Sequence, residues 1–201
     1  MKKGCLVGGI AGLLALIAIV VLWGIGIYNG IIPKNNAVNG QWANVETAYQ
    51  KRADLTEQLV ATVKGARDFE QETLTQVIEA RAKATSVNID PSNLDPSDLA
   101  KFQQAQDGLS SALNRLMVVV VERYPDLKSN QNFLSLQASL ESMADEIRFE
   151  QKKFNDTAQE YNNYIQKIPN NMIAGFGGFK EKGYFKSAEG ADQAPTIDFS
   201  K

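Results

Sequence analysis

Histidine is absent from this 201-residue sequence, and cysteine occurs only once, as Cys5. A Ser-His-Asp triad, a Cys-His pair, an internal disulfide and a zinc site built on histidine or paired cysteines are therefore excluded. Basic residues are also few, because 21 lysines and arginines stand against 23 acidic residues and leave no basic field to neutralise phosphates. We expect no nucleic-acid binding, no metal, no cofactor, no catalytic residues and hence no enzymatic activity.

Charge is missing altogether from residues 4–33, which form a long apolar run. A helix needs about 20 such residues to cross the hydrocarbon core of a bilayer, so we expect a single transmembrane anchor. Lys2 and Lys3 precede the run, which by the positive-inside rule places the N-terminus in the cytoplasm and the following bundle outside the cytoplasmic (inner) membrane. A cleaved signal peptide is the alternative, although this run exceeds the usual apolar region and lacks an A-x-A exit.

Beyond the apolar run, hydrophobic residues recur at helical spacing and predict an all-α fold with three long helices. The first is expected over residues 39–85, with Gly65 as the one place where it bends. The second begins at Asp95-Pro96 and ends at Tyr124-Pro125, and the third runs from about residue 130 to Pro169. Short turns between long helices predict an up-down antiparallel bundle.

The composition changes after Pro169 and divides the chain into three parts. We expect an anchor at 1–33, a bundle at 34–169 and a tail at 170–201. In the tail, glycines disfavour a long helix while aromatic side chains need a surface to cover, so the segment should be irregular and partly docked. The residues concerned are Gly175, Gly177, Gly178, Gly183 and Gly190 with Phe176, Phe179, Tyr184 and Phe185.

Three polar residues lie on or beside the predicted core faces. Arg52 lies next to the apolar stripe, where it either needs an anionic partner, with a role in register or partner recognition, or extends its head to water. Asn155 and Asn162 each follow an aromatic residue, seven positions apart, and are expected to fix register by hydrogen bonding across helices. A polar site that combines these three residues with Asp54 is the alternative.

An ordered set of short motifs over nearly the whole chain resembles the bacterial LemA family. Two of these motifs supply further candidate partner or register residues, Arg81 and Tyr124. The motifs are Arg52-Ala53-Asp54-Leu55, Glu79-Ala80-Arg81-Ala82, Leu109-Ser110-Ser111-Ala112-Leu113-Asn114-Arg115-Leu116, Glu122-Arg123-Tyr124-Pro125-Asp126-Leu127-Lys128, Asn132-Phe133-Leu134, Phe154-Asn155-Asp156, Glu160-Tyr161-Asn162, Tyr184-Phe185 and Asp198-Phe199.

The resemblance implies a single-pass bacterial membrane protein with a long helical bundle, from a family without an established enzymatic activity. Some members are encoded near membrane-associated metalloproteases, which implies a membrane protease as a partner and an accessory role in envelope protein quality control. The leading hypothesis is therefore protein-protein interaction by a membrane-anchored bundle. The alternatives are a small-ligand receptor or enzyme with a polar inter-helix site, and a structural spacer or homo-oligomer.

Overall fold

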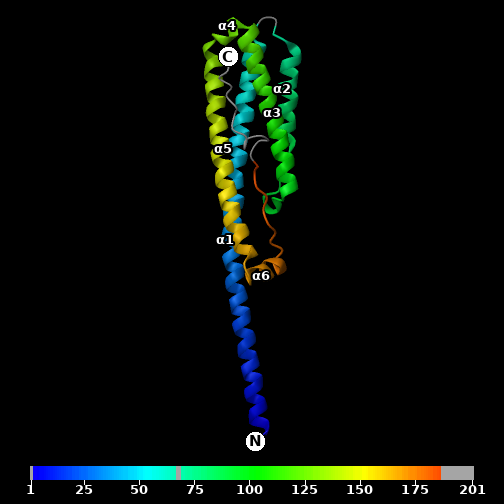
Figure 1. Cartoon of the computed structure of the whole chain (residues 1–201), viewed down its shortest axis with the longest axis vertical. Helices are drawn as coiled ribbons and strands as arrows, with labels where there is room; N and C mark the ends of the chain where they lie inside the picture. The colour runs from blue at the N-terminus through cyan, green and yellow to red at the C-terminus, as the bar shows by residue number, and fades with distance from the viewer. Residues whose placement is uncertain (1, 67–68, 187–201) are drawn as a thin grey trace, which may run out of the picture.

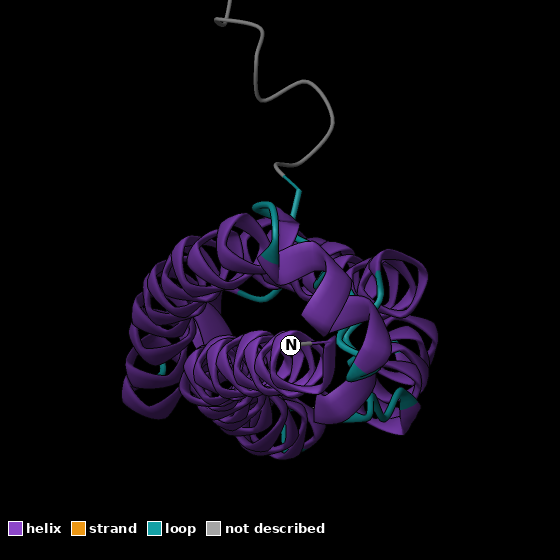
Figure 2. Cartoon of the chain, turned by 90° about the horizontal axis from the view of Figure 1, so that it is seen from below, coloured by secondary structure: helices purple, strands orange, loops and turns teal. Residues whose placement is uncertain are grey.

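Four long helices run up, down, up and down along one axis in a computed structural model that describes residues 2–66 and 69–186 (Figure 1). Within those ranges every regular element is helical, which confirms the predicted all-α fold. Seen from the end that carries the N-terminus, the long helices lie nearly end-on (Figure 2). The elements are α1 (Lys2–Lys64), α2 (Gln71–Ser86), the 3-10 turn η1 (Pro91–Asn93), α3 (Pro96–Arg123), α4 (Pro125–Lys128), α5 (Gln131–Gln166) and α6 (Asn170–Phe176).

Helix α1 combines the apolar run and the first bundle helix in one element of 63 residues. At 1.5 Å per residue it extends over roughly 95 Å, and its N-terminal part projects below the bundle (Figure 1). From Gly8 to Gly26 its side chains are largely exposed, and the first buried ones are Ile27 and Ile31. In the described part of the chain it is the one helix long and apolar enough to cross a membrane.

The expected single helix over residues 39–85 is wrong, because the chain turns back after Lys64 and α2 begins at Gln71. The bundle consequently has four main helices instead of three. Leu59 and Val63 of α1 and Leu74 and Val77 of α2 are all buried in the same apolar cluster. A helical hairpin and one straight helix bury the same stripe of residues, so periodicity alone does not separate them.

The predicted second and third helices are confirmed as α3 and α5. Asp95 caps α3 by accepting hydrogen bonds from the backbone N–H groups of Ser97 and Asp98, at 2.8 and 3.0 Å. Asn130 caps α5 in the same way, accepting from the N–H groups of Asn132 and Phe133. Each side chain satisfies donors that the first helical turn leaves without partners, which fixes where these helices begin.

The core consists of two apolar clusters, one above the other. The proximal cluster, which lies nearer the apolar run of α1, is rich in aromatic side chains, including Trp42, Phe102, Phe154, Tyr161 and Phe185. The distal cluster is mainly aliphatic and includes Leu59, Val63, Leu74, Val77, Leu109, Leu116 and Phe133. Along α1 and α3, the buried polar residues Arg52 and Gln106 lie between the two clusters. The sequence therefore places a polar layer at mid-height of an otherwise apolar bundle.

The described part of the tail, up to Lys186, folds back onto the bundle. After α6 and a turn at Gly177-Gly178, residues 179–186 run upward in an extended conformation along the lower half of the bundle (Figure 1). Phe185 is buried against Trp42, with ring centroids 6.1 Å apart, and against Phe154 at 5.5 Å. The prediction of an irregular, docked tail holds for these residues, whereas Gly190, Pro195 and Asp198-Phe199 lie outside the described residues.

Candidate functional site

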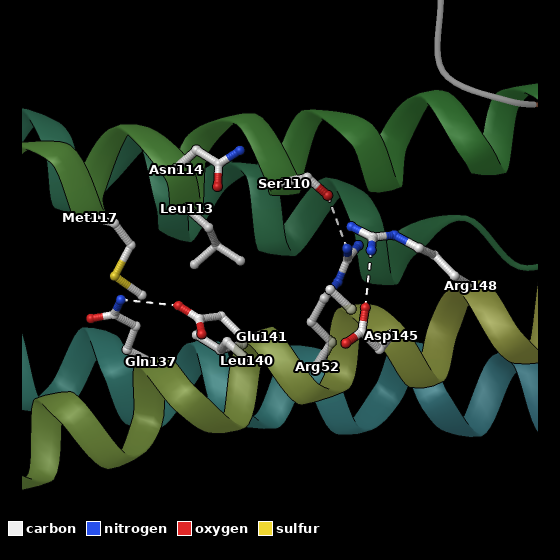
Figure 3. A pocket seen from close by; sticks show the side chains of 11 residues that line it. Arg52, Ser110, Leu113, Asn114, Met117, Gln137, Leu140, Glu141, Asp145 and Arg148 are labelled. Carbon is white, nitrogen blue, oxygen red and sulfur yellow. Dashed lines mark hydrogen bonds and ion pairs between the residues drawn. The ribbon is translucent and has the colours of Figure 1, made fainter. Parts of the chain in front are cut away.

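A groove of about 450 Å³ lies between α3 and α5 above the docked tail segment. Its walls carry Leu113 and Met117 from α3 and Leu140 from α5, and Arg52 reaches into it from α1 (Figure 3). Its rim is polar, because Asp145 and Arg148 form an exposed ion pair at 3.0 Å and Gln137 donates to Glu141 at 3.1 Å. The remaining lining residues are Ser110, Asn114 and Ala144.

Arg52 is 8% exposed and has only neutral hydrogen-bond partners. One terminal nitrogen, Nη1, donates to Ser110 Oγ at 2.9 Å, and the other, Nη2, donates to Gln106 Oε1 at 2.6 Å and to the Gln106 carbonyl oxygen at 3.1 Å. The third nitrogen, Nε, is buried without a partner. Within residues 2–66 and 69–186, no carboxylate lies within ion-pair distance of the guanidinium.

The electrostatic surroundings of Arg52 leave its charge largely uncompensated. Burial lowers the pKa of the guanidinium below its ordinary value, partly offset by Tyr49 and Asp107. The Tyr49 ring lies under the guanidinium at 5.0 Å, but burial raises the pKa of Tyr49 to about 12, so its phenol is neutral at pH 7. Arginine remains protonated in proteins, and a buried charge is stabilised best by an opposite charge. The floor of the groove thus contains a cation that can form an ion pair with a carboxylate.

Gln106 holds this arrangement together and was not singled out as a functional candidate from the sequence. Its side-chain oxygen accepts from Arg52, and its side-chain nitrogen donates to the Ala84 carbonyl of α2 at 3.1 Å. Its position in the sequence could have identified it, because Gln106 is the polar member of the otherwise apolar buried face of α3. A buried glutamine there connects three helices through Arg52 and Ala84.

Asn155 and Asn162 face the docked tail segment, whereas cross-helix hydrogen bonds were expected. Asn155 accepts from the Phe185 N–H and donates to the Phe185 carbonyl, both at 2.9 Å. Asn162 does the same with Lys182, both at 2.8 Å, and also donates to Tyr184 Oη at 2.8 Å. Each asparagine side chain therefore pairs with both the N–H and the carbonyl of one residue of the extended segment, as the backbone of an adjacent β-strand would.

The other side of the tail segment is held by the loop before α3 and by α3 itself. Gly183 donates its N–H to the Leu94 carbonyl at 2.9 Å, and a Cβ at this glycine would lie 2.9 Å from the Cα of Pro96. The Lys186 N–H donates to Gln103 Oε1 at 3.1 Å. Since Gln103 belongs to α3 and Asn155 to α5, the segment fills the lower part of the space between the same two helices that form the groove.

The remaining candidates are dispersed over the bundle. Asp54 is exposed and accepts from Gln50 at 2.9 Å. Arg81 ties α2 to α1, because it donates to the Ala53 carbonyl at 2.9 Å and to Glu57 at 2.6 Å. Tyr124 lies at the distal end, where its hydroxyl accepts from the Glu70 N–H at 3.2 Å and its ring packs against Phe69. The alternative of a polar site that combines Arg52, Asp54, Asn155 and Asn162 is therefore not supported, because these residues do not come together.

Among the described residues, no three aspartate, glutamate or cysteine side chains gather closely enough to hold a metal ion. The chemistry that the groove offers is recognition: apolar walls, a polar rim and a buried guanidinium.

These features define the class of the molecule as a helical bundle carried on an apolar helix that is long enough to cross a membrane. Within this class the chain belongs to the LemA family, whose model matches residues 41–199. The resemblance inferred from the short motifs is thereby confirmed.

Two kinds of relative are similar to this chain. Protein LemA of Metamycoplasma hominis is 24% identical over 150 residues, covering 75% of this chain and 64% of that protein. Magnetosome protein MamQ 2 of Paramagnetospirillum magneticum is 38% identical over 88 residues, and MamQ of Magnetospirillum gryphiswaldense is 36% identical over the same length. Each MamQ match covers 44% of this chain and 32% of the relative, so the chain spans less than two thirds of the length of all three relatives.

Proposed function

We propose that this chain is a membrane-anchored, non-enzymatic binding protein whose α3–α5 groove receives an extended acidic segment of another protein. The observation that carries the proposal is Arg52, a buried guanidinium with neutral partners only, at the floor of a groove with apolar walls. An extended segment presents alternate side chains to opposite sides, so it can place apolar groups on Leu113 and Leu140 while a neighbouring carboxylate reaches a cation. A guanidinium and a carboxylate form strong, geometrically specific pairs.

The names of the relatives are consistent with a binding role, because neither LemA nor magnetosome protein MamQ names a reaction. A protease or its substrate at the membrane is one partner that would present such an extended segment. We therefore propose an accessory role in envelope protein quality control.

A binding measurement on the full chain tests the proposal. A short fluorescent peptide in which glutamates alternate with leucine and phenylalanine should bind the chain in lipid nanodiscs, as read by fluorescence polarisation. Its glutamine-substituted twin should bind at least about tenfold more weakly, since about 1.4 kcal/mol of carboxylate pairing corresponds to tenfold. The Arg52→Met/Gln106→Leu variant should lose the same discrimination.

Equal affinity for both peptides would contradict the proposal. A variant that ends at Lys186 serves as a comparison, because residues 187–201 contain Glu189, Asp192 and Asp198 and follow the segment already lying between α3 and α5. Tighter peptide binding by this variant would show that the chain's own acidic segment competes for the groove.

We further propose that the chain spans the cytoplasmic membrane once, with the bundle outside. Lys2 and Lys3 before the apolar part of α1 support this orientation. In a Cys5→Ser background, Ser142→Cys on the exposed face of α5 should react with a membrane-impermeant maleimide in intact cells, whereas Lys3→Cys should react only after lysis. The reverse pattern would overturn the orientation.

A further inference from the structure

The short helix α6 presents an apolar face that nothing in the described protein covers. Ile168 is 84% exposed, Met172 61% and Phe176 88%, and their spacing of four residues places Met172 and Phe176 on the same side of the helix. The opposite side is used for packing, because Ala174 is buried and Ile173 contacts the proximal core cluster. One apolar face of α6 is therefore docked on the bundle, and a second apolar face is exposed.

The height of α6 along α1 indicates what lies against the open face. Ile173 Cδ1 lies 3.4 Å from the position that a Cβ on Gly24 would occupy, and the Phe179 ring lies 5.5 Å from the ring of Tyr28. The helix therefore lies beside the upper part of the apolar run of α1, crosswise to the long helices (Figure 1). At the same height, Trp23, Ile25 and Tyr28 of α1 are themselves exposed.

The charge pattern around α6 is that of a segment at a bilayer surface. No residue from Ile168 to Phe179 is charged, and exposed lysines flank the stretch on both sides, Lys167 and Lys180. Lysine at the edges of an apolar segment and tryptophan or tyrosine at the same depth are the features of helices that lie in the membrane interface. The open apolar face of α6 lies at the height of exposed apolar residues of the proposed membrane span.

We propose that α6 and Ile168 just before it form an interfacial foot: Ile168, Met172 and Phe176 insert into the lipid headgroup and acyl boundary beside α1. This second attachment, which rests on α1 spanning the membrane, ties the base of α5 and the docked tail segment to the bilayer. The foot holds the bundle upright on α1 and fixes the height of the α3–α5 groove above the membrane.

Environment-sensitive labels on the full chain test this inference. In a Cys5→Ser background, Phe176→Cys, Phe149→Cys and Leu16→Cys are each labelled with a nitrobenzoxadiazole fluorophore in vesicles of phosphatidylcholine and phosphatidylglycerol. Phe149 is the matched control, an exposed phenylalanine of α5 that lies about 25 Å along the helix from its C-terminal end. Leu16 reports on the span itself.

We expect lipids with brominated acyl chains to quench the label at position 176 at least threefold more than the label at 149, and to quench the label at 16 as well. Quenching at 16 without quenching at 176 would overturn the foot and leave the span intact. No quenching at 16 would overturn both. A blue-shifted but unquenched label at 176 would mean that a protein surface covers α6, which also contradicts the inference.

Discussion

Replacing Gln106 with leucine is expected to lower the free energy of unfolding by about 3 kcal/mol, because it removes the closer of the two acceptors of Arg52 Nη2 while the guanidinium stays buried. The backbone carbonyl of residue 106 remains as the other acceptor. Adding Arg52→Met to Gln106→Leu should recover most of the lost free energy of unfolding. The double variant replaces a buried charge and its partner by apolar groups of similar volume, and such replacements are often neutral or stabilising.

Denaturant unfolding of the full chain in detergent, followed by circular dichroism, measures both effects. Gln104→Leu is the matched control, since Gln104 is exposed on the same helix and should change stability by less than about 0.5 kcal/mol. If Gln106→Leu behaves like this control, the guanidinium is not held by Gln106. If the double variant is as unstable as the single one, the cost does not come from an uncompensated charge.

Replacing Asn162 with alanine should release the tail segment from the bundle, at a cost of about 2 to 4 kcal/mol. The substitution leaves both the N–H and the carbonyl of the buried Lys182 without partners and removes the contact to Tyr184. Hydrogen exchange at the Lys182 amide should accelerate, and trypsin should cleave after Lys182 in the folded protein. Asn163→Ala is the control, because Asn163 is the exposed neighbour. Equal protection in the two variants would show that Asn162 does not hold the segment.

Helices α3 and α5 could be predicted from the sequence because their ends carry clear signals. Asp95-Pro96 and Asn130 cap α3 and α5, and Tyr124-Pro125 ends α3. The turn between α1 and α2 was missed, since Gly65 is a weak signal inside a continuous apolar stripe. That stripe is satisfied equally by one long helix and by two helices that face each other.

Only part of the candidate site could be predicted from the sequence, because hydrogen-bond partners depend on how segments distant in sequence meet in the fold. The placement of Arg52 beside the core stripe was evident from spacing, but its partners Gln106 and Ser110 are more than 50 residues away in sequence. Asn155 and Asn162 were recognised as inward-facing. Their partner is the tail segment, whose extended conformation leaves no periodic pattern to read.

The most direct test of the groove uses the few methionines of the chain. With methyl-carbon-labelled methionine, Met117 reports on the groove, Met143 on the buried core and Met172 on α6. Titration of the acidic peptide into the full chain in nanodiscs should shift the Met117 methyl resonance and leave that of Met172 in place, and the shift should vanish in Arg52→Met/Gln106→Leu. An unchanged Met117 resonance at saturating peptide would contradict the claim that the groove binds an acidic segment through Arg52.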